Sequence, residues 1–284
     1  MTDRHLVVGA APEIERQLRN LAARRLVFFA GLPGTGKSLL AHQLAHLAAG
    51  TGRTVHLLQW DVARPLFEAS PAAARYPLKD GVTHATIRKA AGLWVRQAVA
   101  MWDERHPGPE HLLIGETPFV GNRFVELARR AEDRAEPLLA SGSCRFVVAV
   151  PSRDVRRFIE AERERRSAHP RHPREREDAP PQVLRDMWRE LAEVAGRLGI
   201  GAPGGNYDPA AYRRVYETVL RHRNVDVVDL DVILPTGALS VYEFAAAPLD
   251  VVPTENEAVA CIASVERDAD PTAVDRELDR WWEV

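Results

Sequence analysis

The chain has 284 residues, of which 45% are apolar and 27% are charged, a balance typical of globular proteins rather than disordered ones. The 38 lysines and arginines and 40 acidic residues leave a formal net charge of −2, so no bulk positive charge attracts nucleic acid or a membrane. No apolar run approaches the roughly 18 residues of a membrane span, and no signal-peptide pattern is present. We therefore expect a cytoplasmic protein without membrane contact. Cys144 and Cys261 are too few and too far apart for a disulfide framework or a zinc knuckle.

Short apolar runs alternate with segments of helical periodicity along the chain. In chain order the pattern predicts helix Pro12–Arg24, strand Leu26–Ala30, helix Lys37–Ala49, strand Thr54–Gln59, helix Thr86–Trp102, strand His111–Gly115, helix Asn122–Ala135, strand Arg145–Val150, helices Ser152–Arg166, Gln182–Leu198 and Pro209–His222, and strand Val225–Leu230. Because such strands are joined by right-handed crossovers, we expect an α/β fold. It should be a three-layer sandwich in which a mainly parallel five-stranded sheet carries helices on both faces.

A polar excursion and a C-terminal extension complete the predicted organisation. Residues 163–181 are dense in arginine, glutamate and proline, and they separate two predicted helices, which indicates an exposed excursion rather than a domain linker. We expect one domain over residues 1–284, with its core at about 25–235 and its extension at about 236–284. Within the extension, Val241–Phe244 is a candidate strand, and Asn256–Val265 and Ala273–Trp282 are candidate helices.

A glycine-rich segment connects the first predicted strand to the next helix. Gly31–Ser38, with the sequence GLPGTGKS, fits the pattern GxxxxGK[ST] at every fixed position and has the strand–turn–helix context that phosphate binding requires. Backbone N–H groups and the helix N-terminus would hold the phosphates, Lys37 would reach the β- and γ-phosphates, and Ser38 would bind Mg²⁺. We therefore expect ATP and Mg²⁺ as cofactors. The expected nucleotide-binding residues are Gly31, Leu32, Pro33, Gly34, Thr35, Gly36, Lys37, Ser38 and Leu39.

This segment resembles that of the P-loop NTPase superfamily, and the chain looks most like its small kinases: nucleoside-monophosphate, shikimate and gluconate kinases, chloramphenicol phosphotransferase and zeta toxins. The resemblance spans Leu26–Leu230 as topology, but only the glycine-rich segment is specific as sequence. It implies transfer of the γ-phosphoryl group to a small hydroxyl- or phosphate-bearing acceptor. The alternatives are an ATP-hydrolysing regulatory NTPase that acts on a protein partner, and a kinase of a nucleic-acid end or a peptidoglycan sugar. The chain has no guanine-reading NKxD motif, which favours ATP.

Charged residues near the predicted strand ends are candidates for binding the acceptor. Asp61 follows the second strand and would orient the acceptor hydroxyl or accept its proton; the resemblance implies that Arg64 holds the acceptor. Glu116 closes the third strand and would support Mg²⁺ with Ser38, contact the acceptor, or position a water for hydrolysis. Arg123 would bind an anionic or polyhydroxylated acceptor. The structural alternatives are a helix-capping aspartate for Asp61 and a polar strand end for Glu116.

The resemblance places a lid at residues 163–181, whose arginines would contact the transferring phosphoryl group. Val155, Phe158 and Ile159 indicate a buried stripe on the preceding helix. Arg163 shares a face with Arg156, and this face is expected to be solvated.

Continued at helical spacing, the buried stripe reaches Arg165 and Arg166. We expect these two arginines to be catalytic together with Lys37 and Asp61, with Arg171 or Arg174 as further candidates. The structural alternative is a helix end on which arginines and glutamates pair with each other. His169 and His172 lack further ligands nearby in the sequence and make a poor zinc site. The segment has few aromatic residues for stacking bases, which argues against nucleic acid as a partner.

Overall fold

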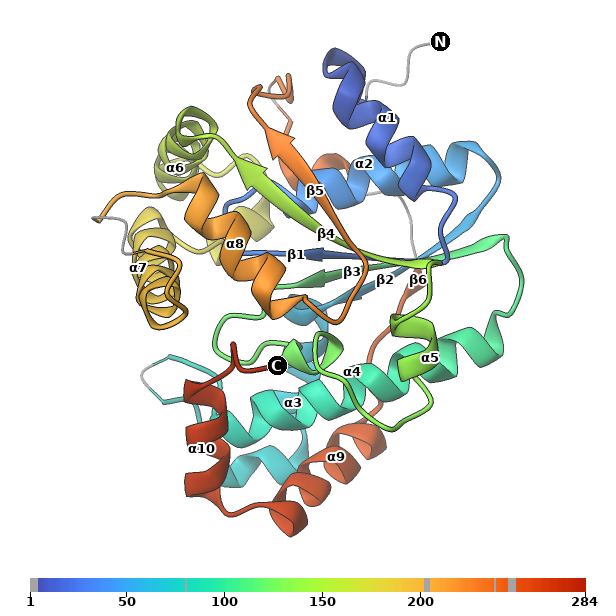
Figure 1. The fold of residues 1–284 in the computed structure, drawn as a ribbon, viewed down its shortest axis with the longest axis vertical. Helices are drawn as coiled ribbons and strands as arrows, with labels where there is room; N and C mark the ends of the chain where they lie inside the picture. The colour runs from blue at the N-terminus through green and yellow to red at the C-terminus, as the bar shows by residue number, and fades with distance from the viewer. Residues whose placement is uncertain (1–4, 80, 202–204, 238, 245–248) are drawn as a thin grey trace.

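The core of this computed structural model is a six-stranded, all-parallel sheet in the order β5-β4-β1-β3-β2-β6 (Figure 1). The structure describes residues 5–79, 81–201, 205–237, 239–244 and 249–284. The strands are β1 (Leu26–Ala30), β2 (Thr54–Gln59), β3 (His111–Thr117), β4 (Cys144–Pro151), β5 (Val225–Leu230) and β6 (Leu249–Asp250). The predicted α/β fold with a parallel sheet is confirmed. The predicted number of strands is wrong by one, because β6 pairs with the edge of β2.

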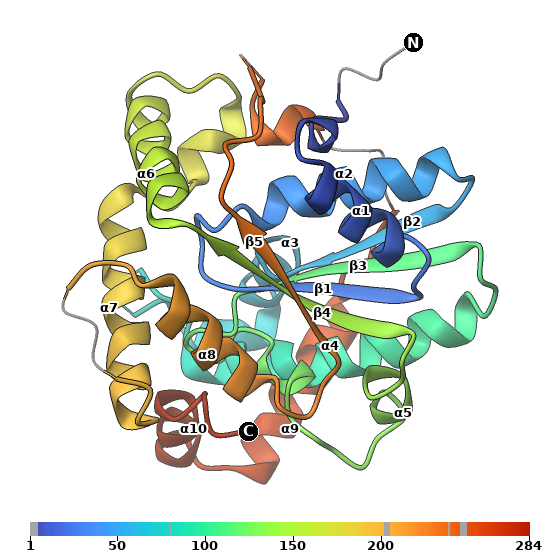
Figure 2. The same ribbon diagram turned by 45° about the horizontal axis from the view of Figure 1, so that its top comes forward.

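Helices cover both faces of the sheet, as Figure 2 shows. The side chains of β1 alternate between two apolar cores: Leu26, Phe28 and Ala30 face one core, and Val27 and Phe29 face the other. The first core is shared with α3, α4 and α7 to α10, and the second with α1 and α2. The helices are α1 (Pro12–Leu21), α2 (Lys37–Gly50), α3 (Trp60–Glu68), α4 (Ala85–Arg105), α5 (Glu136–Leu139), α6 (Arg153–Ala168), α7 (Pro181–Arg197), α8 (Pro209–Val219), α9 (Glu255–Asp268) and α10 (Pro271–Asp279).

The C-terminal extension is part of the first core, because α9 and α10 both pack on α4. The two predicted helices are thereby confirmed. The candidate strand Val241–Phe244 is wrong: these residues form a short 3₁₀ helix, η5. Its backbone is bonded locally, since Glu243 N–H donates to the Ser240 carbonyl and the Glu243 side chain accepts from Ser240 N–H. Residues 238 and 245–248 of the extension lie outside the described part of the chain.

The predicted helix Asn122–Ala135 is also wrong. The segment contains a short 3₁₀ helix, η3 (Val125–Leu127), followed by irregular chain up to α5. Two buried arginines replace the helical hydrogen bonds: Arg96 donates to the carbonyls of Glu126 and Arg129 at 2.7 and 2.9 Å, and Arg223 donates to that of Leu127 at 2.7 Å. Because buried carbonyls need a donor from any source, the apolar periodicity of this segment does not require a helix.

The arginine-rich excursion is more helical than expected. Helix α6 continues to Ala168, a short 3₁₀ helix η4 (Pro173–Glu177) follows, and α7 begins at Pro181. The excursion therefore lies between two packed helices, α6 and α7, which contact each other. Within the described ranges, no helix is long and apolar enough to cross a membrane.

Candidate functional site

The order of the strands marks the carboxyl end of β1 as the place where a ligand would bind. The chain passes from β1 to β2 and β3 on one side, and then crosses to β4 and β5 on the other. Crevices form outside the strand ends at such a reversal, and ligands of open α/β sheets bind there. Ala30 at the end of β1 pairs in register with Thr117 of β3 and Val148 of β4. The segment Gly31–Ser38 starts at this point and leads into α2.

The glycine-rich segment is a turn that requires glycine at several positions. Gly31, Gly34 and Gly36 have φ values of 145°, 71° and 85°, a region that other residues rarely adopt. Space is limited as well, because a Cβ atom on Gly31 would lie 2.1 Å from the Tyr212 hydroxyl oxygen, and one on Gly34 would lie 2.8 Å from Leu184 Cδ1. The turn is therefore closely packed against α7 and α8.

Arg156 of α6 holds this turn from outside. It is only 2% exposed, and its guanidinium donates to the carbonyls of Pro33 and Gly34, both at 2.9 Å, and to that of Leu184 at 3.1 Å. In a trans peptide the N–H points away from the C=O. The N–H groups of Gly34 and Thr35 are thus directed away from Arg156, and successive N–H groups with a common direction form a binding site for an anion. The expectation that Arg156 lies on a solvated face is wrong.

Lys37 is a buried cation beside the turn. It is 7% exposed, and its ammonium donates to the Leu32 carbonyl at 2.8 Å, as does the Thr35 hydroxyl. Burial lowers the pKa of Lys37 to about 8, although the negative charges of Glu116 and Asp61 oppose this shift. An additional negative charge nearby stabilises the protonated form of such a buried lysine. A bound anion would supply that charge.

Glu116, at the end of β3, is fixed by two donors. The Ser38 hydroxyl donates to its Oε2 at 2.9 Å, and the Gln59 amide donates to its Oε1 at 2.8 Å. Burial raises the pKa of Glu116, while Lys37 and the two hydrogen bonds act in the opposite direction. A hydroxyl and a carboxylate are thus held together beside the lysine, and Mg²⁺ prefers such hard oxygen ligands.

Asp61, Arg64 and Arg123 are the three charged residues that we expect to bind an acceptor. Asp61 is in the first turn of α3, and its charge acts on Lys37, Glu116 and Arg123. Arg64 is bound to Glu68 at 3.0 Å. Burial lowers the pKa of Arg123, although the charges of Glu190 and Asp61 act to raise it. Among the described residues, the Arg123 guanidinium makes no hydrogen bond and no ion pair.

Arg123 is carried by a strained loop. Phe119, Asn122 and Phe124 have φ values of 61°, 59° and 64°, and such conformations of residues other than glycine are often found at binding sites. The backbone groups of Phe119 and Arg123 are hydrogen-bonded in both directions, and Arg88 of α4 donates to the Gly121 carbonyl at 2.6 Å. This tight loop, rather than the expected helix, brings Arg123 to the end of β3.

The arginines chosen from helical phase lie elsewhere. Arg165 is exposed and pairs with Glu162, and Arg166 pairs with Glu175 at 2.9 Å. Within the described ranges, neither makes a hydrogen bond or an ion pair with the glycine-rich turn, so the structure agrees with the alternative of a self-paired helix end. In contrast, Arg163 donates to the Ala179 carbonyl at 3.0 Å, and its charge lowers the pKa of Lys37.

The buried face of α6 differs from the stripe that helical spacing predicted. Val155 is buried as expected, but Phe158 is 36% exposed, so the inward face is rotated toward Arg156 and Arg163. Of the other two candidate arginines, Arg171 donates to the Gly237 carbonyl and Arg174 stacks on Tyr242.

Sequence reasoning missed Gln59 and Arg156. Gln59 could have been found, because it is the polar last residue of an apolar strand next to Asp61. Arg156 had no such signal among the many arginines of its helix.

A surface hollow of about 440 Å³ lies far from these residues in the fold, between Tyr76, Thr86 and the α9–α10 junction.

Comparisons with known proteins identify no relative: no family model matches the chain, and no curated protein or solved structure matches it significantly. The α/β fold and the arrangement of the residues described above are therefore the basis for any functional conclusion.

Proposed function

We propose that the chain is a P-loop phosphotransferase that uses Mg²⁺ and ATP to phosphorylate a small acceptor. The proposal rests chiefly on the hydrogen bond of 2.9 Å between Ser38 and Glu116 beside the buried Lys37. This contact joins the end of β3 to the GxxxxGKS segment that follows β1, so that residues 78 positions apart supply one set of oxygen ligands and a cation.

The chemistry of these residues fits Mg·ATP. Ser38 and Glu116 would hold the metal, which supplies charge neutralisation between the phosphates when bound. The N–H groups of Gly34 and Thr35 and the N-terminus of α2 would bind phosphate oxygens. Lys37 would exchange its bond to the Leu32 carbonyl for a phosphate oxygen.

On the acceptor side, Asp61 orients the acceptor hydroxyl and takes its proton. The acceptor oxygen forms a bond to the γ-phosphorus as the bond from this phosphorus to the β–γ bridging oxygen breaks, and ADP leaves with that oxygen. Arg123, whose guanidinium has no partner among the described residues, favours an acceptor that carries an anionic group such as a phosphate or a carboxylate. Arg64 and Arg88 would contribute further positive charge.

The experiment follows γ-labelled ATP with Mg²⁺ and fractionated cell extract as the source of acceptors. Label should move to an organic species, and this transfer should fall by about 10²–10³-fold in Lys37→Met and by about 10²–10⁴-fold in Asp61→Asn. Asp154→Asn is the matched control, because Asp154 is exposed and pairs with Arg157, and it should keep the activity of the wild type.

The same assay separates the alternatives. Release of inorganic phosphate that is insensitive to Asp61→Asn but abolished in Glu116→Gln would indicate a hydrolytic NTPase and refute the kinase. Label that moves only to a macromolecular fraction would indicate a kinase of a polymer end. No turnover of label in the wild type, together with no ATP binding, would refute the proposed nucleotide site.

A further inference from the structure

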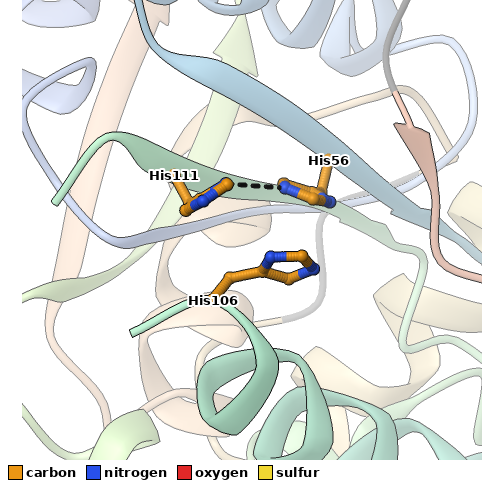
Figure 3. Close-up of side chains that lie close together, drawn as sticks. All are labelled: His56, His106 and His111. Atoms are coloured by element: carbon orange, nitrogen blue, oxygen red, sulfur yellow. Dashed lines mark hydrogen bonds between the residues drawn. The ribbon is translucent and has the colours of Figure 1, made fainter. Parts of the chain in front are cut away.

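Three histidines converge at the opposite edge of the sheet from the glycine-rich turn. His56 lies on β2, His111 is the first residue of β3, and His106 directly follows α4. Figure 3 shows the three rings facing one another, with each from a different element. His111 begins β3, His56 is the third residue of β2, and His106 lies in the loop that leads to β3, so the three histidines share no residue with the proposed nucleotide site. In the sequence they are separated by up to 55 positions, which is why no motif indicated them.

We propose that His56, His106 and His111 form a zinc site. One nitrogen atom from each ring lies within 4.8 Å of the corresponding atoms of the other two. His56 Nε2 and His111 Nδ1 are 3.1 Å apart. Zinc–nitrogen bonds of about 2.0–2.1 Å at tetrahedral angles separate two ligand nitrogens by roughly 3.3–3.4 Å. Binding therefore requires only a small outward shift of this pair and an approach of the His106 ring.

One of the two facing nitrogens carries the proton of the His56–His111 hydrogen bond, and zinc would take the place of this proton, which the other nitrogen of the same ring can carry. His56 is 3% exposed, and the rings of His106 and His111 are partly buried. Glu110 Oε1 lies 3.6 Å from His111 Nε2, so a small movement would bring this carboxylate within hydrogen-bond distance of that nitrogen. A proton held on Nε2 would leave the Nδ1 lone pair for the metal, as in the carboxylate–histidine pairs of zinc sites.

Arg25 fixes the backbone that carries two of these ligands. Its guanidinium donates to the carbonyl of His106 at 2.6 Å, to that of Gly108, and to that of His111 at 3.4 Å. Its positive charge, which would oppose a bound cation, is balanced by Asp103 at 2.6 Å. Three carbonyls of the loop between α4 and β3 and its junction with β3 are therefore hydrogen-bonded without any metal. Three imidazoles leave the fourth tetrahedral position to water or an exogenous ligand.

The test is a titration of the chelator-treated protein with Zn²⁺ in competition with a chromophoric chelator. We expect one Zn²⁺ per chain, and at least a tenfold loss of affinity in His106→Asn. His222→Asn should bind like the wild type, because His222 lies between α8 and β5, and β5 is separated from β2 and β3 by β4 and β1. Lys37→Met should also keep its zinc, because the two sites lie at opposite edges of the sheet.

Two results would overturn the proposal. If the wild type takes up no stoichiometric Zn²⁺, or if His106→Asn binds as the wild type does, the three rings are an aromatic cluster, in which His56 and His106 contact Trp102, and not a metal site. Circular dichroism checks the fold of the variant, and His111→Gln replaces it if it is unfolded. Co²⁺ bound to the wild type gives a measurement that needs no variant: the intense visible absorption of a tetrahedral complex supports the site, and the weak spectrum of six-coordinate Co²⁺ refutes it.

Discussion

Replacement of Arg156 by alanine should destabilise the protein more than any other single arginine replacement on α6. The side chain is 2% exposed and makes four polar contacts, with the carbonyls of Pro33, Gly34 and Leu184 and with Glu160 at 2.9 Å. In Arg156→Ala three carbonyls lose a charged donor, and the carboxylate of Glu160 loses its buried partner.

The size of the effect follows from these contacts. A hydrogen bond to a charged group contributes about 1.5–3 kcal/mol, and removal of one partner from a buried ion pair costs about 3–5 kcal/mol. The contacts share one side chain and are not additive, so we expect a loss of about 3–5 kcal/mol in the free energy of unfolding. For a domain of this size that corresponds to a fall in Tm of roughly 6–20 °C. Arg156→Lys keeps the charge but has no planar fork, so its loss should be intermediate.

The assay is urea unfolding followed by circular dichroism, with Arg157→Ala as the matched control. Arg157 is the next residue on the same helix, its side chain is 80% exposed, and it pairs with an equally exposed Asp154. Its replacement should change the free energy of unfolding by no more than about 0.5 kcal/mol. If Arg156→Ala and Arg157→Ala are equally mild, the argument that Arg156 holds the glycine-rich turn is refuted.

Three further predictions concern pH and backbone strain. Lys37→Met should have a larger free energy of unfolding than the wild type at pH 7. This difference should narrow as pH rises from about 8 to about 10.5, because in that range the unfolded wild type binds more protons at Lys37 than the folded wild type does, so the wild type gains stability. Burial would raise the pKa of Glu136, but its hydrogen-bonded arginines lower it to about 2. The protein should therefore lose stability as pH falls from about 4.5 toward 2. In Glu136→Gln this loss of stability with falling pH should be less steep. Gly31→Ala should cost more stability than Gly52→Ala: both glycines have positive φ, but the space around Gly52 is open.

Each of these has a clear contrary result. A Lys37→Met variant whose stability difference is constant up to pH 10.5 would contradict the lowered pKa. For the acid range, Glu132→Gln is the control, since Glu132 is exposed; equal slopes in both glutamate variants would contradict the role of Glu136. Equal losses of Tm in the two glycine variants would show that backbone strain alone matters and that the close approach of Tyr212 to Gly31 does not.

Much of the fold was predictable from the sequence because its signals are local. Continuous apolar runs such as Leu26–Ala30 predict buried parallel strands, since both faces of such a strand contact helices. The segment Gly31–Ser38 fixes its own turn, because its glycines adopt the required φ values and the next residues favour a helix. Asp61 and Glu116 follow from a similar local rule, because they stand close to the carboxyl ends of β2 and β3, and Lys37 and Ser38 begin the helix after the turn that follows β1.

Only the tertiary structure decided which arginines reach this edge. Helical spacing predicts which side chains share a face, but not which face meets the core. The face of α6 that is turned inward carries Arg156 and Arg163, and not the expected Arg165 and Arg166. The periodicity of residues 122–135 predicted a helix, yet Arg96 and Arg223, distant in sequence, supply donors to its carbonyls and make a helix unnecessary. The histidine cluster has the same origin. Contacts between residues far apart in the chain depend on how whole elements pack, and no local pattern records that packing.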